Sequence, residues 1–139
     1  MIGVDTNVLL RFYIEDDSDS EAKRQRKAAA SLFSGSAVLF VPKSVLLECE
    51  WVMRAIYGYP SEQVLAVFDH LLELPHVRIE DADSVDNAIR AYRKGLDFAD
   101  SLHLASCANC ASFATFDDRQ LARRAAKMGI VPVCRVPKA

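Results

Sequence analysis

Ile2–Arg11 (IGVDTNVLLR) places a short apolar run directly before a helical pattern, and this junction decides the fold class. Ile2–Val4 predicts a strand, and Thr6 to about Ile14 predicts a helix. Short apolar runs alternate with longer helical patterns in the same way along the rest of the chain. Such alternation is typical of an α/β fold with a mainly parallel sheet.

Four further apolar runs and six further helical patterns complete the predicted order of elements. The strands are expected at Val38–Val41, Val77–Ile79, Ser112–Thr115 and Ile130–Val133, the last as an edge strand because Pro132 cannot donate to a ladder. The helices are expected after the polar turn Asp16–Ser20 up to about Phe33, and at about Ser44–Tyr57, Ser61–Leu74, Ala82–Lys94, Phe98–Cys110 and Asp118–Met128. No internal repeat or linker divides the chain, so residues 1–139 are predicted to form a single domain.

The composition is that of an ordinary globular protein. The chain has 139 residues, of which 51% are hydrophobic and 26% charged, and its net charge is −2. This balance excludes a simple basic clamp on nucleic acid, so binding of phosphate would call for a bound divalent cation. No stretch reaches the ~20 apolar residues that span a bilayer, and no secretory leader is apparent. We therefore expect a cytoplasmic protein without a membrane partner.

The cysteines are scattered along the chain and are expected to be reduced thiols. Cys107 and Cys110 form a C-x-x-C pair, a spacing found in zinc sites and in redox pairs. No second pair of this kind occurs, and this one lies in a helical, alanine-rich run. The sequence therefore favours structural cysteines over a zinc or redox site.

Two carboxylates follow predicted strands. Asp5 comes directly after the first strand, and Asp117 lies two residues past Thr115. Functional groups of parallel α/β sheets gather outside the carboxyl ends of the strands, so we expect both acids at one edge of the sheet. The alternative is that each acid caps the helix that follows it.

A third carboxylate lies in the helix after the second strand. The predicted inward stripe of this helix, at about 100° per residue, consists of Val45, Cys49, Val52 and Ile56. Glu48 flanks this stripe and is expected to point into a crevice, whereas Glu50 is expected to face water. The alternative for Glu48 is an ion pair with Lys43 or Arg54.

Asp100 opens the segment Asp100–Ala108, which is apolar on nearly every side. Such a helix is expected to be buried, and an acid at its start is costly unless it is paired or bound to a metal. Asp97 and Asp100 also fit a variant of the capping box, in which both are structural. Four acids are thus predicted at one end of the sheet, where like charges repel unless cations are present. Hard carboxylate oxygens without convergent His or Cys favour Mg²⁺ or Mn²⁺ over zinc.

Four segments around these acids resemble, in the same order, the motifs of the PIN domain family. They are Val4–Arg11 (VDTNVLLR), Leu46–Arg54 (LLECEWVMR), Asp97–Ala105 (DFADSLHLA) and Thr115–Asp117 (TFD). A single D-T-N is a weak signal, but the four motifs together cover essentially the whole chain. The resemblance implies a PIN-like three-layer α/β/α fold, in which helices surround a mainly parallel central sheet.

By this resemblance, the catalytic and metal-binding acids are Asp5, Glu48, Asp100 and Asp117. Polar supports beside them are Thr6, Asn7, Ser44, Asp97, Ser101 and Thr115. The alignment with the family motifs is open at two acids. Asp97 could be a helix cap or an outer ligand, and Asp118 could be only an acid at the start of a helix. The implied reaction is hydrolysis of RNA phosphodiester bonds by an endoribonuclease with one or two Mg²⁺ or Mn²⁺ ions, leaving 5′-phosphate and 3′-hydroxyl ends.

Small PIN proteins of this length resemble the VapC-like toxins of type II toxin–antitoxin pairs. That resemblance implies an RNA substrate, an antitoxin protein whose tail occupies the cleft, and a homodimer. Expected interface residues, with core burial as the alternative, are Trp51, Met53, Tyr57 and Tyr59. Expected contacts to RNA or an acidic partner are Arg119, Arg123, Arg124 and Lys127, whereas a solvated face is favoured for Lys23, Arg24, Arg26 and Lys27. His70 and His76 are expected to be structural. His103, one turn beyond Asp100, is expected to be a core histidine, with contact to the site as the alternative.

Three other functions fit the sequence less well. A phosphatase or phosphotransferase of the haloacid-dehalogenase type would need a second Asp where the chain has Asn7. Structure-specific DNA nucleases share the acidic chemistry but resemble longer chains. A catalytically inert PIN-like module that binds RNA or protein is the main alternative, and metal binding would separate it from a nuclease. Glycine-rich nucleotide-binding loops are absent from the sequence.

Overall fold

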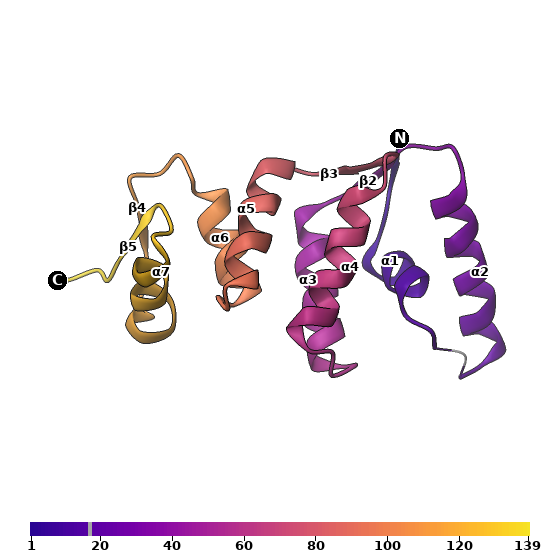
Figure 1. Ribbon diagram of the computed structural model, residues 1–139, viewed down its shortest axis with the longest axis horizontal. Helices are drawn as coiled ribbons and strands as arrows, with labels where there is room; N and C mark the ends of the chain where they lie inside the picture. The colour runs from indigo at the N-terminus through magenta and orange to yellow at the C-terminus, as the bar shows by residue number, and fades with distance from the viewer. Residues whose placement is uncertain (17) are drawn as a thin grey trace. The chain divides into compact units, whose positions relative to one another are not determined.

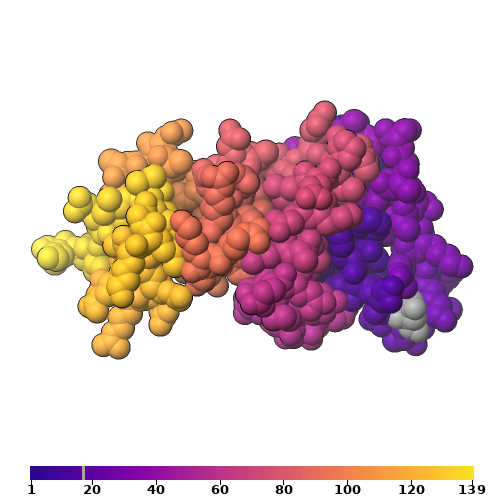
Figure 2. Space-filling model, viewed as in Figure 1, coloured from indigo at the N-terminus to yellow at the C-terminus, as the bar shows by residue number. Residues whose placement is uncertain are grey.

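A computed structural model describes residues 1–16 and 18–139 of the chain (Figure 1). Its contacts divide the chain into two compact units, Met1–Glu80 and Asp81–Ala139. Each unit has its own sheet and its own helices, and within each the side chains fill the space between the ribbons (Figure 2). The prediction that residues 1–139 form one domain stays a prediction. Residue 17, inside the expected turn Asp16–Ser20, lies outside the described residues.

The first unit is a parallel three-stranded sheet with four helices. Its elements in chain order are β1 (Ile2–Gly3), α1 (Thr6–Tyr13), α2 (Ser20–Ser34), β2 (Leu39–Val41), α3 (Lys43–Ala55), α4 (Ser61–Glu73) and β3 (Val77–Ile79). The strands lie in the order β1-β2-β3, with Ile2 opposite Leu39 and Leu39 opposite Val77. All three carboxyl ends therefore meet at one edge of this sheet. The predicted parallel α/β class is confirmed.

Burial of apolar side chains holds these elements together. The fully buried side chains of this unit include Leu9, Leu39, Val41, Leu46, Met53, Val64, Phe68 and Leu71. Phe12 on α1 stacks on Phe33 of α2 with ring centroids 4.3 Å apart. The Tyr13 hydroxyl lies 2.7 Å from His70 Nδ1 on α4, and burial raises the pKa of Tyr13. Aromatic contacts thus fix α1 against both α2 and α4.

The buried face of α3 differs from the predicted one. The residues that it buries are Leu46, Cys49, Glu50 and Met53, whereas Trp51 and Ile56 are exposed. The helix is therefore rotated relative to the expected stripe, although the new stripe also has helical spacing. Glu50, expected to face water, is only 2% exposed. Its carboxylate is tolerated there because Arg54 Nε donates to Glu50 Oε2 at 2.9 Å.

The second unit contains a two-stranded parallel sheet and helices. Its elements are α5 (Ala82–Arg93), α6 (Phe98–Ser106), β4 (Ser112–Ala114), a single π-helical turn η1 (Asp118–Ala122), α7 (Arg123–Met128) and β5 (Val133–Arg135). Ser112 of β4 is opposite Val133 of β5. One cluster of buried residues, Ala91, Leu96, Leu104, Leu121 and Ala125, joins α5, α6, η1 and α7. None of the helices among residues 1–16 and 18–139 is long and apolar enough to cross a membrane.

The largest differences from the sequence prediction in this unit are at β5, α6 and η1. The last strand is Val133–Arg135 rather than Ile130–Val133, since Pro132 has no N–H to donate to a ladder. α6 ends at Ser106 instead of Cys110, because the Cys107 and Ala108 amides bond three residues back and close the helix in tight turns. The expected helix Asp118–Met128 begins as the π-helical turn η1.

Candidate functional site

Asp5 lies where β1 ends and α1 begins. It is the N-cap of α1, and its Oδ1 accepts a hydrogen bond of 2.7 Å from the backbone N–H of Thr6. The cap expected as an alternative is therefore present, yet Asp5 Oδ2 accepts no hydrogen bond from the described residues. Thr6 is buried, and its Oγ1 has no partner within the described part of the chain. Asn7 is exposed on the first turn of α1.

Glu48 lies on α3 in the same unit, and its side chain is exposed. Its carboxylate forms no ion pair with any described residue, since Arg54 bonds to Glu50 instead. Between these two glutamates, Cys49 is buried. Burial, followed by the negative charges of Glu48 and Asp5, raises the pKa of the Cys49 thiol to about 12. Asp5 and Glu48 therefore both lie within electrostatic range of one thiol.

Glu80 is an acid at this sheet edge that the sequence prediction missed. It directly follows β3, and its backbone N–H donates to Val41 O at 3.0 Å. Its Oε1 accepts a hydrogen bond of 2.8 Å from the N–H of Lys43, at the start of α3. Ser44, a predicted support, is exposed in that same first turn. The signal for Glu80 was its place directly after Val77–Ile79, by the reasoning that selected Asp5.

Asp100 lies in the first turn of α6 in the second unit. Asp97 is the N-cap of this helix, and its Oδ2 accepts the Asp100 N–H at 3.1 Å. Ser101 is buried, and its hydroxyl donates to Asp97 O at 2.8 Å, so Asp97 and Ser101 both build the helix start. Burial raises the pKa of Asp100, and the charges of Asp97 and Asp117 also raise it, whereas His103 lowers it. His103 is exposed, so its prediction as a core histidine is wrong.

Asp117 follows β4 and is the N-cap of η1. Its Oδ1 accepts the Gln120 N–H at 2.9 Å, and its own N–H donates to Thr115 Oγ1 at 3.0 Å. Thr115 therefore holds the backbone at Asp117. Asp118 is engaged elsewhere, because its Oδ2 accepts from Arg123 Nη2 at 2.8 Å and Nε at 3.0 Å. Asp100 and Asp117 thus lie within electrostatic range of each other.

The basic side chains fall into the two groups that the sequence suggested. In the first group, Arg24 pairs with Glu21 and Arg26 pairs with Glu15, as in a solvated helix face. The second group follows Asp117, and of its members Arg123 pairs with Asp118. Arg119 is exposed and forms no ion pair with the residues that the structure describes. The second group therefore keeps a cation that could contact phosphate.

The chemistry of the acids fits a divalent cation. Their donors are hard carboxylate oxygens, and those of Glu48 and Asp5 Oδ2 are not neutralised by a described cation. In the first unit Asp5 and Glu48 both lie within electrostatic range of Cys49, and in the second unit Asp100 lies within electrostatic range of Asp117. Within residues 1–16 and 18–139, no group of three or more His, Cys, Asp or Glu side chains is arranged to hold a metal ion.

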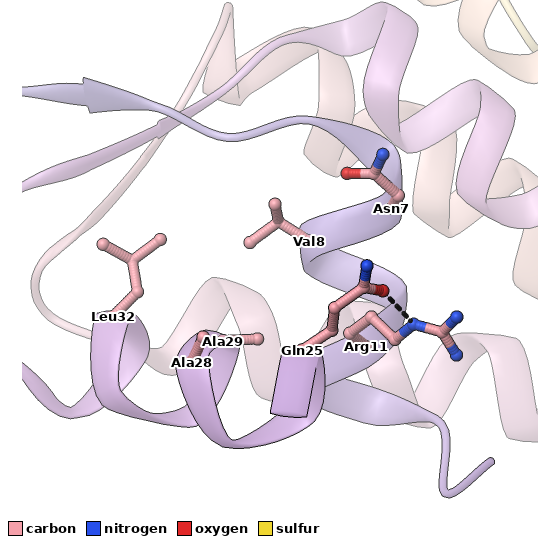
Figure 3. Close-up of a pocket in the computed structure, with 7 residues that line it drawn as sticks. All are labelled: Asn7, Val8, Arg11, Gln25, Ala28, Ala29 and Leu32. Atoms are coloured by element: carbon pink, nitrogen blue, oxygen red, sulfur yellow. Dashed lines mark hydrogen bonds between the residues drawn. The ribbon is translucent and has the colours of Figure 1, made fainter. Parts of the chain in front are cut away.

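A cavity of about 440 Å³ lies between α1 and α2 in the first unit (Figure 3). Val8 and Leu32 point into it, and Arg11 Nε donates to Gln25 Oε1 at 2.9 Å at one end (Figure 3). Asn7, at the other end, connects the cavity to the helix that begins at Asp5. The cavity is mainly apolar and contains none of the four predicted acids.

Comparison with known proteins agrees with these motifs and this fold. Residues 2–127 match the PIN domain family, and no curated protein matches the chain. PIN domains are generally nucleases, they generally use divalent metals, and their fold is the three-layer α/β/α arrangement with parallel strands. The match includes all four acidic motifs, from Asp5 to Asp117, and spans nearly the full sequence, so the chain belongs to the PIN domain family.

Proposed function

We propose that this protein is a metal-dependent endoribonuclease that hydrolyses RNA phosphodiester bonds. The four acids that serve the reaction are Asp5, Glu48, Asp100 and Asp117. Three observations support the proposal. Asp5 and Glu48 both lie within electrostatic range of the Cys49 thiol, Asp100 lies within electrostatic range of Asp117, and no cation of the described chain neutralises Glu48. Carboxylate oxygens are the donors that Mg²⁺ and Mn²⁺ prefer, so a divalent cation of this kind is the proposed cofactor.

A bound divalent cation would acidify a water molecule and neutralise charge on the scissile phosphate. The chain's own residues prepare the acids for this role. Asp97 and Ser101 fix the start of α6 and so position Asp100. Thr115 positions Asp117, and the start of α1 positions Asp5. The acids are therefore preorganised by helix caps rather than by flexible loops.

As its biological role, we propose that the nuclease is the toxin of a toxin–antitoxin pair and acts in the cytoplasm as a homodimer. Its support is the resemblance of the chain to VapC-like toxins together with apolar surface on and after α3. Trp51 is 52% exposed and Tyr57 is also exposed, so both are available to a second copy or an antitoxin. Tyr59 is only half-buried, and Met53, which the sequence also suggested, is fully buried and belongs to the core.

The decisive experiment is cleavage of a mixed tRNA and rRNA pool by the purified protein with Mg²⁺, with Mn²⁺ and with EDTA. We expect discrete products in the presence of either metal and none with EDTA. Asp100→Asn should lower the rate by at least about 100-fold, beyond the loss typical of outer-sphere partners. Asp83→Asn, which changes an exposed acid on α5, is the matched control and should cleave normally.

Circular dichroism of both variants separates lost chemistry from lost folding. A folded Asp100→Asn protein that cuts RNA at the normal rate would remove Asp100 from the site. Folded wild-type protein that cuts no RNA in any metal would instead favour the inert binding module.

A further inference from the structure

Phe116 lies between Thr115 and Asp117, in a turn that is held by several hydrogen bonds. The Asp117 N–H donates to Thr115 Oγ1 at 3.0 Å, and the Asp118 N–H donates to Phe116 O at 3.1 Å. With φ −84° and ψ 88°, Asp117 is the central residue of an inverse γ-turn. Capping of η1 through Asp117 Oδ1 holds the other side of the turn. The backbone on both sides of Phe116 is therefore fixed.

The Phe116 side chain is 82% exposed despite this fixed backbone. A large aromatic ring left in water forgoes the free energy of burial, and a rigid turn gives it no route into the core. Phe113, the large side chain of the preceding strand β4, packs against the core cluster of the second unit. The exposure of Phe116 is thus a property of its position beside Asp117 and not of a poorly packed strand.

Positive charge accompanies this ring. Arg119 lies three residues further on, is exposed, and forms no ion pair with a described residue. Arg124 and Lys127 on α7 are exposed as well. An exposed aromatic ring in a segment that also carries exposed cations is the combination with which proteins hold single-stranded nucleic acid, since bases stack on the ring and phosphates contact the cations. An apolar protein partner would not need these cations.

We propose that Phe116 is a stacking platform for an unpaired nucleobase of the RNA, next to the phosphate at which Asp117 acts. The inference deepens the proposed nuclease function and rests on it. Adjacent residues have Cα atoms about 3.8 Å apart, so a phosphate at Asp117 leaves the neighbouring base within reach of the Phe116 ring. Arg119 contacts the RNA backbone. A base inside a duplex is already stacked on both faces, so the platform selects single-stranded RNA.

The test measures RNA binding separately from cleavage. The probe is a short single-stranded RNA that contains 2-aminopurine, whose fluorescence is quenched when it stacks, and Asp5→Asn in Mg²⁺ supplies a cleavage-deficient background. We expect quenching on binding, and a loss of affinity of roughly 5- to 150-fold with Phe116→Ala. Phe116→Tyr should bind RNA with the affinity and quenching of the parent, whereas Phe116→Leu should show the same losses as Phe116→Ala. The matched control is Val131→Ala, which trims another exposed apolar side chain of this unit and should change neither signal.

Each outcome bears on the proposal. Equal affinity and quenching for Phe116→Ala and its parent would overturn the stacking site, while cleavage by the wild-type chain would leave the nuclease function standing. Restoration by Phe116→Leu would show apolar contact without stacking and would also overturn it. Loss of a dimer in Phe116→Ala, with RNA affinity unchanged, would assign the ring to a second copy of the chain.

RNA binding with Phe116-dependent quenching but no cleavage by the wild type would support the stacking site and contradict the nuclease. A parent that binds no RNA would overturn both.

Discussion

Several of the proposed site residues would have two functions, because they also begin helices. Asp5 caps α1, Asp97 caps α6, and Asp117 caps η1. A capping carboxylate stabilises backbone N–H groups that would otherwise have no partner. Loss of activity after removal of such an acid therefore has two possible causes, lost chemistry and lost local structure. Substitutions that keep the cap but remove the charge separate these causes.

Asp117 offers this separation most directly. Asn is as good an N-cap as Asp, whereas Ala costs about 1 kcal/mol at such a position. We expect both Asp117→Asn and Asp117→Ala to lose RNA cleavage, and only Asp117→Ala to lose about 1 kcal/mol in the free energy of unfolding. Urea denaturation followed by circular dichroism measures the stability. If Asp117→Asn cleaves RNA at the wild-type rate, the residue is a cap alone.

At the scale of elements, the sequence predicts most of the fold because each apolar run is bounded by clear signals. Val77–Ile79 is predicted with its observed bounds, since it is short, apolar and flanked by helical patterns. The face of α3 is not predictable in this way, because apolar side chains occur all round that helix. Its rotation is decided by packing that brings Glu50 inside with Arg54 as partner. That pairing is a property of the folded helix and not of the apolar pattern.

The candidate site is predictable to a different degree. The strand-end position marks Asp5 and Asp117, and the helix start marks Asp100, on the strength of the amino-acid pattern alone. Glu80 has the same strand-end position, but its role in capping α3 from β3 depends on the pairing of β2 with β3 and is not predictable from the sequence. Phe116 likewise has no sequence signal for exposure, since an aromatic residue beside a strand is expected to be buried.

The two glutamates of α3 give a prediction at this scale. Glu50 is buried and bonded to Arg54, so Glu50→Gln weakens a charge-assisted hydrogen bond and should destabilise the fold by about 1–3 kcal/mol. Glu48 is exposed, so Glu48→Gln should leave the free energy of unfolding within about 0.5 kcal/mol of wild type. RNA cleavage should show the reverse order, with Glu48→Gln almost inactive and Glu50→Gln active at low temperature. Urea titration and cleavage assays on the same two proteins test this, and the opposite pattern would make Glu50 the functional acid.

At the scale of the whole molecule, the proposed function requires metal to bind the folded chain and not the unfolded one. A net charge of −2 makes general attraction to RNA weak, so the ion has to supply local positive charge. A ligand that binds only the folded state stabilises it by about 2.7 kcal/mol at a 100-fold excess over Kd.

Thermal unfolding measures the stabilisation of the folded chain by bound metal and needs no RNA. We expect Mn²⁺ or Mg²⁺ to raise the Tm of the wild-type protein and EDTA to reverse the rise. Asp100→Asn should lose most of this shift, and Asp83→Asn should keep it. An equal shift in wild type and Asp100→Asn would mean that the metal stabilises the protein from some other place.

The caps at Asp5 and Asp117 have a consequence for ion selectivity. In each carboxylate, Oδ1 accepts a backbone N–H, and Oδ2 accepts no hydrogen bond within the described chain. Since one oxygen of each carboxylate already accepts a backbone N–H, an ion would bind through the other oxygen alone. Bidentate binding would need both oxygens to turn toward the same ion. Ca²⁺ readily takes bidentate carboxylates in a large, flexible shell, whereas Mg²⁺ requires a compact octahedron. If Asp5 and Asp117 bind the metal as proposed, the hydrogen bonds that begin two helices would leave one oxygen of each carboxylate for the ion and would favour Mg²⁺ over Ca²⁺.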